Sequence, residues 1–234
     1  MVGAAEDKAA SQTLDRGLRI LDVLAEADRP LTIAEVATGI GVHRSVAYRL
    51  VRTLEDRGLV IRDEAGALQI GPHVATLARS VASDLQSAAA PELRALADAL
   101  SMTAFLVVLD QHECVTLATA EPRAAVASIA QRPGSRHPVT MGAPGVAIQT
   151  LLGPADRVTH GLDEAEAPEV TRAREAGFAV SSGEVIAGVT AVAAPIAGAY
   201  PAAIAVLFVD ADNVAAVGAR VTAAALAVSG RQRG

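Results

Sequence analysis

The chain has almost no aromatic residues and only one cysteine. Tryptophan is absent, and aromatic residues make up 2% of the 234 positions, although 51% of the chain is hydrophobic. A sizeable core is therefore available, and it must be built from Ala, Val and Leu. The lone Cys114 excludes an intrachain disulfide framework and fits a reducing cytosol. We expect it to be a small buried hydrophobe at the start of a strand and not a reactive thiol.

The sequence also lacks a general basic excess and an export signal. Its net charge of −6 gives no overall attraction to a polyanion, so any affinity for nucleic acid must come from a local patch. Residues 1–13 have no apolar signal core and are predicted to form a disordered tail. The uncharged stretch Val185–Val209 is long enough to cross a bilayer. Two prolines and a glycine within 195–201 favour two buried strands instead, so no membrane association is expected.

Motifs for catalysis are missing as well. The chain has no nucleophile elbow, no P-loop and no dinucleotide-binding glycine motif. Its five histidines are scattered, without cysteine or carboxylate neighbours at metal-ligand spacing. Glu184 is a lone carboxylate before an apolar run, which is weak evidence for acid–base chemistry. We therefore expect no enzyme activity, no metal and no cofactor.

The most informative segment is Val42–Arg57, which predicts an amphipathic helix. At about 100° per residue, one arc of this helix is apolar and can bury against a small core: Val46, Ala47, Leu50, Val51 and Leu54. The opposite arc carries Arg44, Ser45, Tyr48, Arg49 and Arg52. Arginine can form bidentate hydrogen bonds with guanine or phosphate, and hydroxyl groups can form hydrogen bonds with phosphates or base edges. This second arc is therefore suited to a nucleic-acid groove.

The flanking residues complete a winged helix-turn-helix. Thr32 and Glu35 predict a capping box at the start of a short helix. A tight turn at 39–41 separates that helix from Val42–Arg57, and an earlier helix is predicted over Leu14–Ala25. Gly58 is placed for a helix C-cap, and a β-hairpin over 59–70 follows as the wing.

Local charge supports DNA binding over a purely structural three-helix unit. Between Ile40 and Arg62 there are five arginines and two carboxylates, a net charge of +3, whereas Leu14–His73 as a whole carries −1. The positive charge is thus confined to the presumed recognition helix and the first strand of the wing. A winged helix that binds a protein partner remains an alternative, which a DNA gel shift would distinguish. We expect the DNA surface to comprise Thr32, His43, Arg44, Ser45, Tyr48, Arg49 and Arg52.

The rest of the chain predicts a connector and an α/β domain. His73–Gln86 is predicted to be one helix whose narrow apolar stripe (Val74, Leu77, Val81 and Leu85) packs on a neighbour such as a second subunit. A sheet covered by helices on both faces should follow. The expected strands are Ala104–Leu109, Cys114–Thr119, Val126–Gln131, Val189–Ala194 and Ala202–Val209. The expected helices begin at Pro91, Pro144, Pro168 and Val214.

After the winged helix and the connector, five short segments follow in a characteristic order. They are GSRHP at 134–138, GAPGVA at 142–147, GFA at 177–179, EVIAGV at 184–189 and VAAPI at 192–196. Over residues 14–229 the chain resembles the IclR family of bacterial transcription regulators. The resemblance implies a GAF-like effector domain behind the winged helix, a dimer or tetramer on operator DNA, and a small organic acid or aromatic catabolite as effector.

Three features depart from the family. Val146 stands where a lysine is frequent, Ala191 stands where a cysteine is frequent, and the segment between Leu152 and Gly177 is short. The acidic part of that segment is predicted to be a solvated loop. These departures leave the DNA-binding prediction intact, and they predict a less basic, more apolar effector site.

A candidate effector site lies at the predicted helix start over 142–146. Free backbone N–H groups and the helix dipole there can hold an anion, and two glycines permit close approach. The alternative is an ordinary turn whose glycines serve packing. Nearby Arg132, Arg136 and His137 could attract an anion, although a solvated basic loop is favoured. The effector-binding residues expected from these arguments and the resemblance are Met141, Gly142, Ala143, Gly145, Val146, Glu184, Val189 and Ala191.

These observations predict an α+β protein with four parts. They are a tail (1–13), a winged helix-turn-helix (14–72), a connector helix (73–90) and a GAF-like effector domain (91–234). The predicted function is a cytoplasmic, sequence-specific transcriptional regulator that acts as a homodimer or homotetramer and responds to a small carboxylate. A C-terminal domain that mediates protein interaction without a ligand is the alternative.

Overall fold

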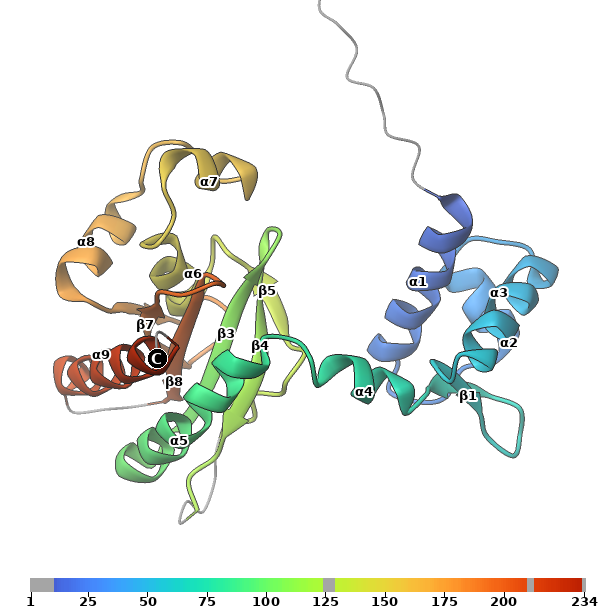
Figure 1. The fold of residues 1–234 in the computed structure, drawn as a ribbon, viewed down its shortest axis with the longest axis horizontal. Helices are drawn as coiled ribbons and strands as arrows, with labels where there is room; N and C mark the ends of the chain where they lie inside the picture. Colours follow the sequence, from blue (N-terminus) through green and yellow to red (C-terminus); the bar gives the residue numbers. More distant parts are fainter. Residues whose placement is uncertain (1–10, 124–128, 210–212, 233–234) are drawn as a thin grey trace, which may run out of the picture. The chain divides into compact units, whose positions relative to one another are not determined.

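The structure, a computed structural model, describes residues 11–123, 129–209 and 213–232 (Figure 1). The chain divides into two compact units, one ending at Val81 and the other beginning at Ala82. Each unit has a hydrophobic core of its own.

The first unit is the predicted winged helix-turn-helix. Its elements are α1 (Gln12–Glu26), α2 (Ile33–Gly39), α3 (Arg44–Asp56), β1 (Val60–Arg62), β2 (Leu68–Ile70) and α4 (His73–Ala78). Fully buried side chains from three helices and both strands form the core: Ile20, Val36, Val51, Val60 and Leu68. Helix α1 begins at Gln12, so the predicted tail over 1–13 was two residues too long.

The local signals at the helix ends act as expected. The Thr32 side chain accepts a hydrogen bond from the Glu35 N–H, and the Glu35 carboxylate accepts the Thr32 N–H at 2.7 Å, which confirms the capping box. A hydrogen bond from Arg29, together with those from Thr32, lowers the pKa of Glu35 to about 2. Gly41 at φ +67° forms the turn before α3, and Gly58 at φ +68° follows the end of α3.

The single connector helix predicted over His73–Gln86 is wrong. Helix α4 ends at Ala78, α5 spans Ser83–Leu100, and Ala82 between them adopts a left-handed φ of 44°. The predicted apolar stripe is therefore divided, because Leu77 is exposed whereas Leu85 lies in the core of the second unit.

The helix predicted to start at Pro91 is also misplaced, because this proline lies in the interior of α5. A proline ring cannot donate the usual backbone hydrogen bond inside a helix. Burial of Leu85, Ala89, Leu93, Leu96 and Ala97 along one side of α5 holds the helix together across this gap.

The second unit is built around a six-stranded sheet in which every neighbouring pair is antiparallel. The strand order is β5-β4-β3-β8-β7-β6. The strands are β3 (Thr103–Asp110), β4 (Glu113–Ala120), β5 (Arg136–Pro138), β6 (Ala179–Ser182), β7 (Thr190–Ile196) and β8 (Ala202–Phe208).

Four of these strands were predicted, and β5 and β6 were not. The uncharged stretch Val185–Val209 forms β7, β8 and their loops, as expected from its prolines. Residues 126–128 of the predicted strand Val126–Gln131 lie outside the described residues, and 129–131 are not a strand.

Helices cover both faces of this sheet (Figure 1). Helices α5 and α9 (Val214–Arg231) pack on one face, against alternate residues such as Leu106 and Ile204. Helix α6 (Gly142–Gln149) packs on the other face, against residues such as Phe105 and Ala205, and α8 (Pro168–Ala176) packs against α6 and β6. Among the described helices, only α9 is long and apolar enough to cross a membrane, and its buried residues belong to the first of these two cores.

A short helix that was not predicted, α7 (Pro154–Thr159), precedes the acidic segment before α8. Its Arg157 is only 3% exposed and donates to the backbone oxygens of Asp163 and Ala165. These bonds hold part of the segment that was expected to be a solvated loop.

The close contact between α6 and the preceding chain leads to a stability prediction. A Cβ on Gly145 would lie 2.3 Å from the Val139 backbone oxygen. Gly145→Ala should therefore lower the free energy of unfolding by about 1–3 kcal/mol, because backbone must move to relieve the clash. Gly153→Ala is the matched control, since its Cβ would meet nothing closer than 3.6 Å. Urea denaturation followed by circular dichroism measures both, and equal stability of the two variants would contradict the packing.

Candidate DNA-binding surface and effector cavity

The start of α3 gathers most of the polar residues predicted to contact DNA. Ala47 and Val51 are fully buried and fix the inner side of the helix. His43 is the N-cap residue, and its Nδ1 accepts the Ser45 N–H at 3.3 Å and lies 2.9 Å from the Ser45 hydroxyl. Tyr48 is 53% exposed one turn later. The helix start is thus rigid inside and polar outside.

Three arginines on the outer side of α3 carry unpaired charge. Arg44, Arg49 and Arg52 are exposed, and their guanidinium groups make no hydrogen bond or ion pair with any residue that the structure describes. Arg62 differs, since its Nε lies 2.6 Å from the Glu55 carboxylate. The wing strand was expected to contribute positive charge, but its Arg62 is neutralised, whereas Arg44, Arg49 and Arg52 on α3 keep their charge.

The structure brings five of the seven predicted DNA residues onto one open, shallow surface, lined by His43, Arg44, Ser45, Tyr48 and Arg49. Arg52 follows one turn further along α3. Thr32 stands apart, because it caps α2 and its hydroxyl donates to Glu35 at 2.8 Å. The Thr32 hydroxyl thus already forms hydrogen bonds within the first unit.

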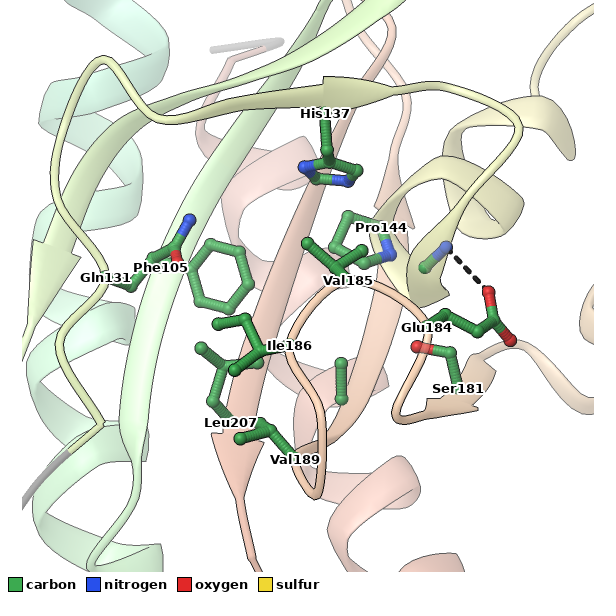
Figure 2. A pocket seen from close by; sticks show the side chains of 12 residues that line it. Phe105, Gln131, His137, Pro144, Ser181, Glu184, Val185, Ile186, Val189 and Leu207 are labelled. Atoms are coloured by element: carbon green, nitrogen blue, oxygen red, sulfur yellow. Dashed lines mark hydrogen bonds between the residues drawn. The ribbon is translucent and has the colours of Figure 1, made fainter.

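A small cavity of about 30 Å³ lies in the second unit, between the sheet and the start of α6 (Figure 2). The inner wall is apolar and comes mainly from β3, β7 and β8, with Phe105, Ala191 and Leu207. The outer wall is the loop between β6 and β7, with Val185 and Ile186. Four polar side chains also reach the cavity: Gln131, His137, Ser181 and Glu184.

The backbone N–H groups at the start of α6 were predicted to be free, and this is wrong. The Gly142 N–H donates to Glu184 Oε2 at 2.8 Å (Figure 2). The Ala143 N–H donates to Ser181 Oγ at 2.8 Å. Both acceptors lie about forty positions further along the chain, on β6 and the loop after it. Sequence spacing gives no indication of such a contact.

The residues predicted for the effector site divide into two groups. Four of them line the cavity: Gly142, Glu184, Val189 and Ala191. The other four do not. Met141 is 39% exposed, Ala143 is packed in the core, Gly145 touches Val139, and Val146 faces a separate surface hollow beside α8. At Gly145 the packing interpretation of the glycine is therefore the correct one.

His137 is far more buried than its sequence context predicted. It was assigned to a solvated basic loop, yet it is only 9% exposed on β5, and its ring points into the cavity toward Pro144 and Val185 (Figure 2). Its Nε2 is buried and has no hydrogen-bond partner among the residues described. Burial lowers the pKa of His137, only partly opposed by Glu113, so the ring is neutral near pH 7. The Nε2 of a neutral imidazole can either donate one hydrogen bond to a bound molecule or accept one from it.

The other residues singled out nearby have structural partners. Arg136 pairs with both Asp110 and Glu113 at 2.7 Å, so its charge is not available to an anion. Cys114 is fully buried in β4, and burial raises the pKa of its thiol to about 12. A thiol in that state is not a nucleophile.

Comparisons with known proteins agree with this architecture. The profile of the IclR helix-turn-helix domain matches residues 13–64, and that of the bacterial transcriptional regulator IclR C-terminal domain matches residues 78–229. The chain is 29% identical over 198 residues to the probable transcriptional regulator SauR of Cupriavidus necator, covering 77% of this chain and 78% of that protein. It is 27% identical over 202 residues to XynR of Escherichia coli, covering 79% and 80%.

Solved structures share the whole fold. An IclR-type regulator from Alicyclobacillus acidocaldarius superposes with a TM-score of 0.80 at 25% identity, covering 95% of this chain and 99% of the other. An IclR homologue from Microbacterium hydrocarbonoxydans, solved as a complex with 4-hydroxybenzoate, also gives a TM-score of 0.80, at 22% identity, over 94% of this chain and 99% of the other. The two family profiles together span both units, and the chain belongs to the IclR family of bacterial transcriptional regulators.

Proposed function

We propose that this regulator binds operator DNA through the outer face of α3 and is controlled by a small organic acid held in the cavity beside α6. The observation that carries the DNA-binding role is the set of unpaired guanidinium groups at Arg44, Arg49 and Arg52. Recognition helices contact base edges near their N-terminal end, so Arg44 and Ser45 are assigned to base contacts. Arg49 and Arg52 are assigned to phosphates. We expect a cytoplasmic protein, because its proposed target is DNA. No catalytic role is assigned to any residue.

Two arginine variants test the DNA-binding face. Arg44→Ala should weaken the free energy of binding to the cognate DNA site by about 1–3 kcal/mol and reduce the preference for one base, because a bidentate contact to that base is lost. Arg52→Ala should weaken binding to all sequences and reduce the salt slope by about one unit, because one phosphate contact is lost. Fluorescence anisotropy over a salt series measures both effects.

Arg29→Ala is the control for these variants. It removes one positive charge from the same unit, but Arg29 is already paired with Glu35 at 2.5 Å. If Arg44→Ala and Arg52→Ala bind DNA as tightly as Arg29→Ala does, α3 is not the DNA surface.

Assembly is the second part of the proposal. One winged helix reads only a short half-site, so specific binding requires at least a dimer on a nearly palindromic operator. Leu14, Leu18, Leu77 and Val81 are exposed on α1 and around α4, and burying such side chains between copies would stabilise a dimer. Sedimentation at micromolar concentration should show a dimer or tetramer. A monomer, both with and without operator DNA, would contradict this.

The effector is proposed to be an aromatic or otherwise apolar carboxylic acid. The cavity wall is largely apolar, with Val189 and Ala191 in it, and His137 offers one unpartnered ring nitrogen. A fold relative is bound to 4-hydroxybenzoate, which has this chemistry. The cavity has a volume of only about 30 Å³, so we expect the loop between β6 and β7 to move when such an acid binds.

Filling the cavity tests this location. Ala191→Leu should abolish the thermal stabilisation of the full chain by any benzoate-type acid that stabilises the wild type, because the added side chain occupies the apolar wall. Ala199→Leu, on an exposed loop of the same unit, should leave that stabilisation unchanged. A hit that stabilises the Ala191→Leu protein as strongly as the wild type would place the effector elsewhere.

A further inference from the structure

The start of α6 already holds a carboxylate, and it belongs to the chain itself. Glu184 Oε2 accepts the Gly142 N–H at 2.8 Å (Figure 2), and the Ser181 hydroxyl accepts the N–H of Ala143 at the same distance. Helix N-termini stabilise anions through these N–H groups and the helix dipole. The place where an acid effector would bind most favourably is therefore occupied before any ligand arrives.

Glu184 lies on a short loop that has a glycine at each end. Gly183 and Gly188 bracket this loop, at φ +72° and +73°, and the Gly183 N–H closes it by donating to the Val189 oxygen at 2.8 Å. Glu184 itself is exposed, and Val185 and Ile186 cover the cavity while remaining 48% and 38% exposed. The Glu184 carboxylate can therefore leave the Gly142 N–H and stay hydrated, and movement of the loop would uncover the cavity.

A second, independent feature at this place points to a ligand. The buried Nε2 of His137 has no partner among the described residues, and the ring projects into the same cavity. A methyl group placed on Gly142 would lie 3.7 Å from that nitrogen and 2.9 Å from Val185 Cγ2. The start of α6, the unpartnered imidazole of His137 and the loop thus border the same cavity.

We propose that the Glu184 carboxylate is a built-in competitor of the effector, an inference that rests on the proposed acid effector. The carboxylate of the incoming acid takes the place of Glu184 on the Gly142 N–H, and its apolar part enters the cavity under His137. Two carboxylates cannot share one helix start at low cost, because like charges repel at short range. Binding therefore expels Glu184 and opens the loop 183–188.

This exchange sets the direction of a mutational effect. When a site is open only part of the time, the apparent affinity falls in proportion to the open fraction. Removing the side chain of Glu184 leaves the N–H groups permanently available. From the usual strength of a helix-capping interaction, Glu184→Ala should bind the acid about three- to thirtyfold more tightly than the wild type. Glu184→Gln keeps an acceptor but loses the charge, so its affinity should lie between the two.

Isothermal titration calorimetry on the full chain tests the exchange, with benzoate, 4-hydroxybenzoate and related aromatic acids as probes. Glu175→Ala is the control, because it removes one exposed carboxylate from α8 of the same unit and should leave the affinity unchanged. Hydrogen exchange supplies a second measurement. The amides of 183–189 should exchange faster when the wild type is saturated with acid, and faster in Glu184→Ala without acid.

The outcomes separate this inference from the proposed function. If an acid binds the wild type and Glu184→Ala binds it equally or more weakly, the proposed competition is wrong. Glu184 then either has no effect on binding or contacts the ligand directly. If none of the acids binds the wild type or Glu184→Ala, the acid effector itself is refuted, and the exchange with it. In neither case is the assignment of α3 to DNA affected.

Discussion

The burial of both faces of the six-stranded sheet is the constraint on which the second unit depends. Every residue of β8 is buried, with alternate side chains packed against α5 and α9 on one face and against α6 on the other. Alanines such as Ala193 and Ala205 face α6 and allow it to approach closely. That approach places the start of α6 beside β6, where Ser181 and Glu184 cap its N–H groups. The cavity and its cap are consequences of how the sheet is covered.

In the first unit, ion pairs within the chain determine which arginines remain available to contact DNA. Local composition counts Arg62 with the arginines of α3, but Glu55 neutralises it across the contact between helix and wing. Arg44, Arg49 and Arg52 retain free guanidinium groups because that side of α3 faces solvent and not the core. A chain with a net charge of −6 can thus present one positive face to DNA.

The elements governed by local signals were predictable from the sequence. Helical periodicity identified α3, and the capping box at Thr32 and the turn glycines placed its neighbours, since these contacts join residues a few positions apart. Features set by tertiary packing were not. The break at Ala82, the proline inside α5 and the burial of His137 depend on partners distant in sequence. The capping of Gly142 by Glu184 does too, so the N–H groups at the start of α6 were wrongly expected to be free.

The central claim is that the outer face of α3 reads a specific DNA sequence in a symmetric assembly. Selection of bound sequences from a random DNA pool by the purified full chain, followed by sequencing, tests this claim without knowledge of the operator. We expect enrichment of one nearly palindromic motif whose half-sites are separated by about one helical turn or a multiple of it. Failure to enrich any motif, with DNA retained only in proportion to its charge at low salt, would contradict the account.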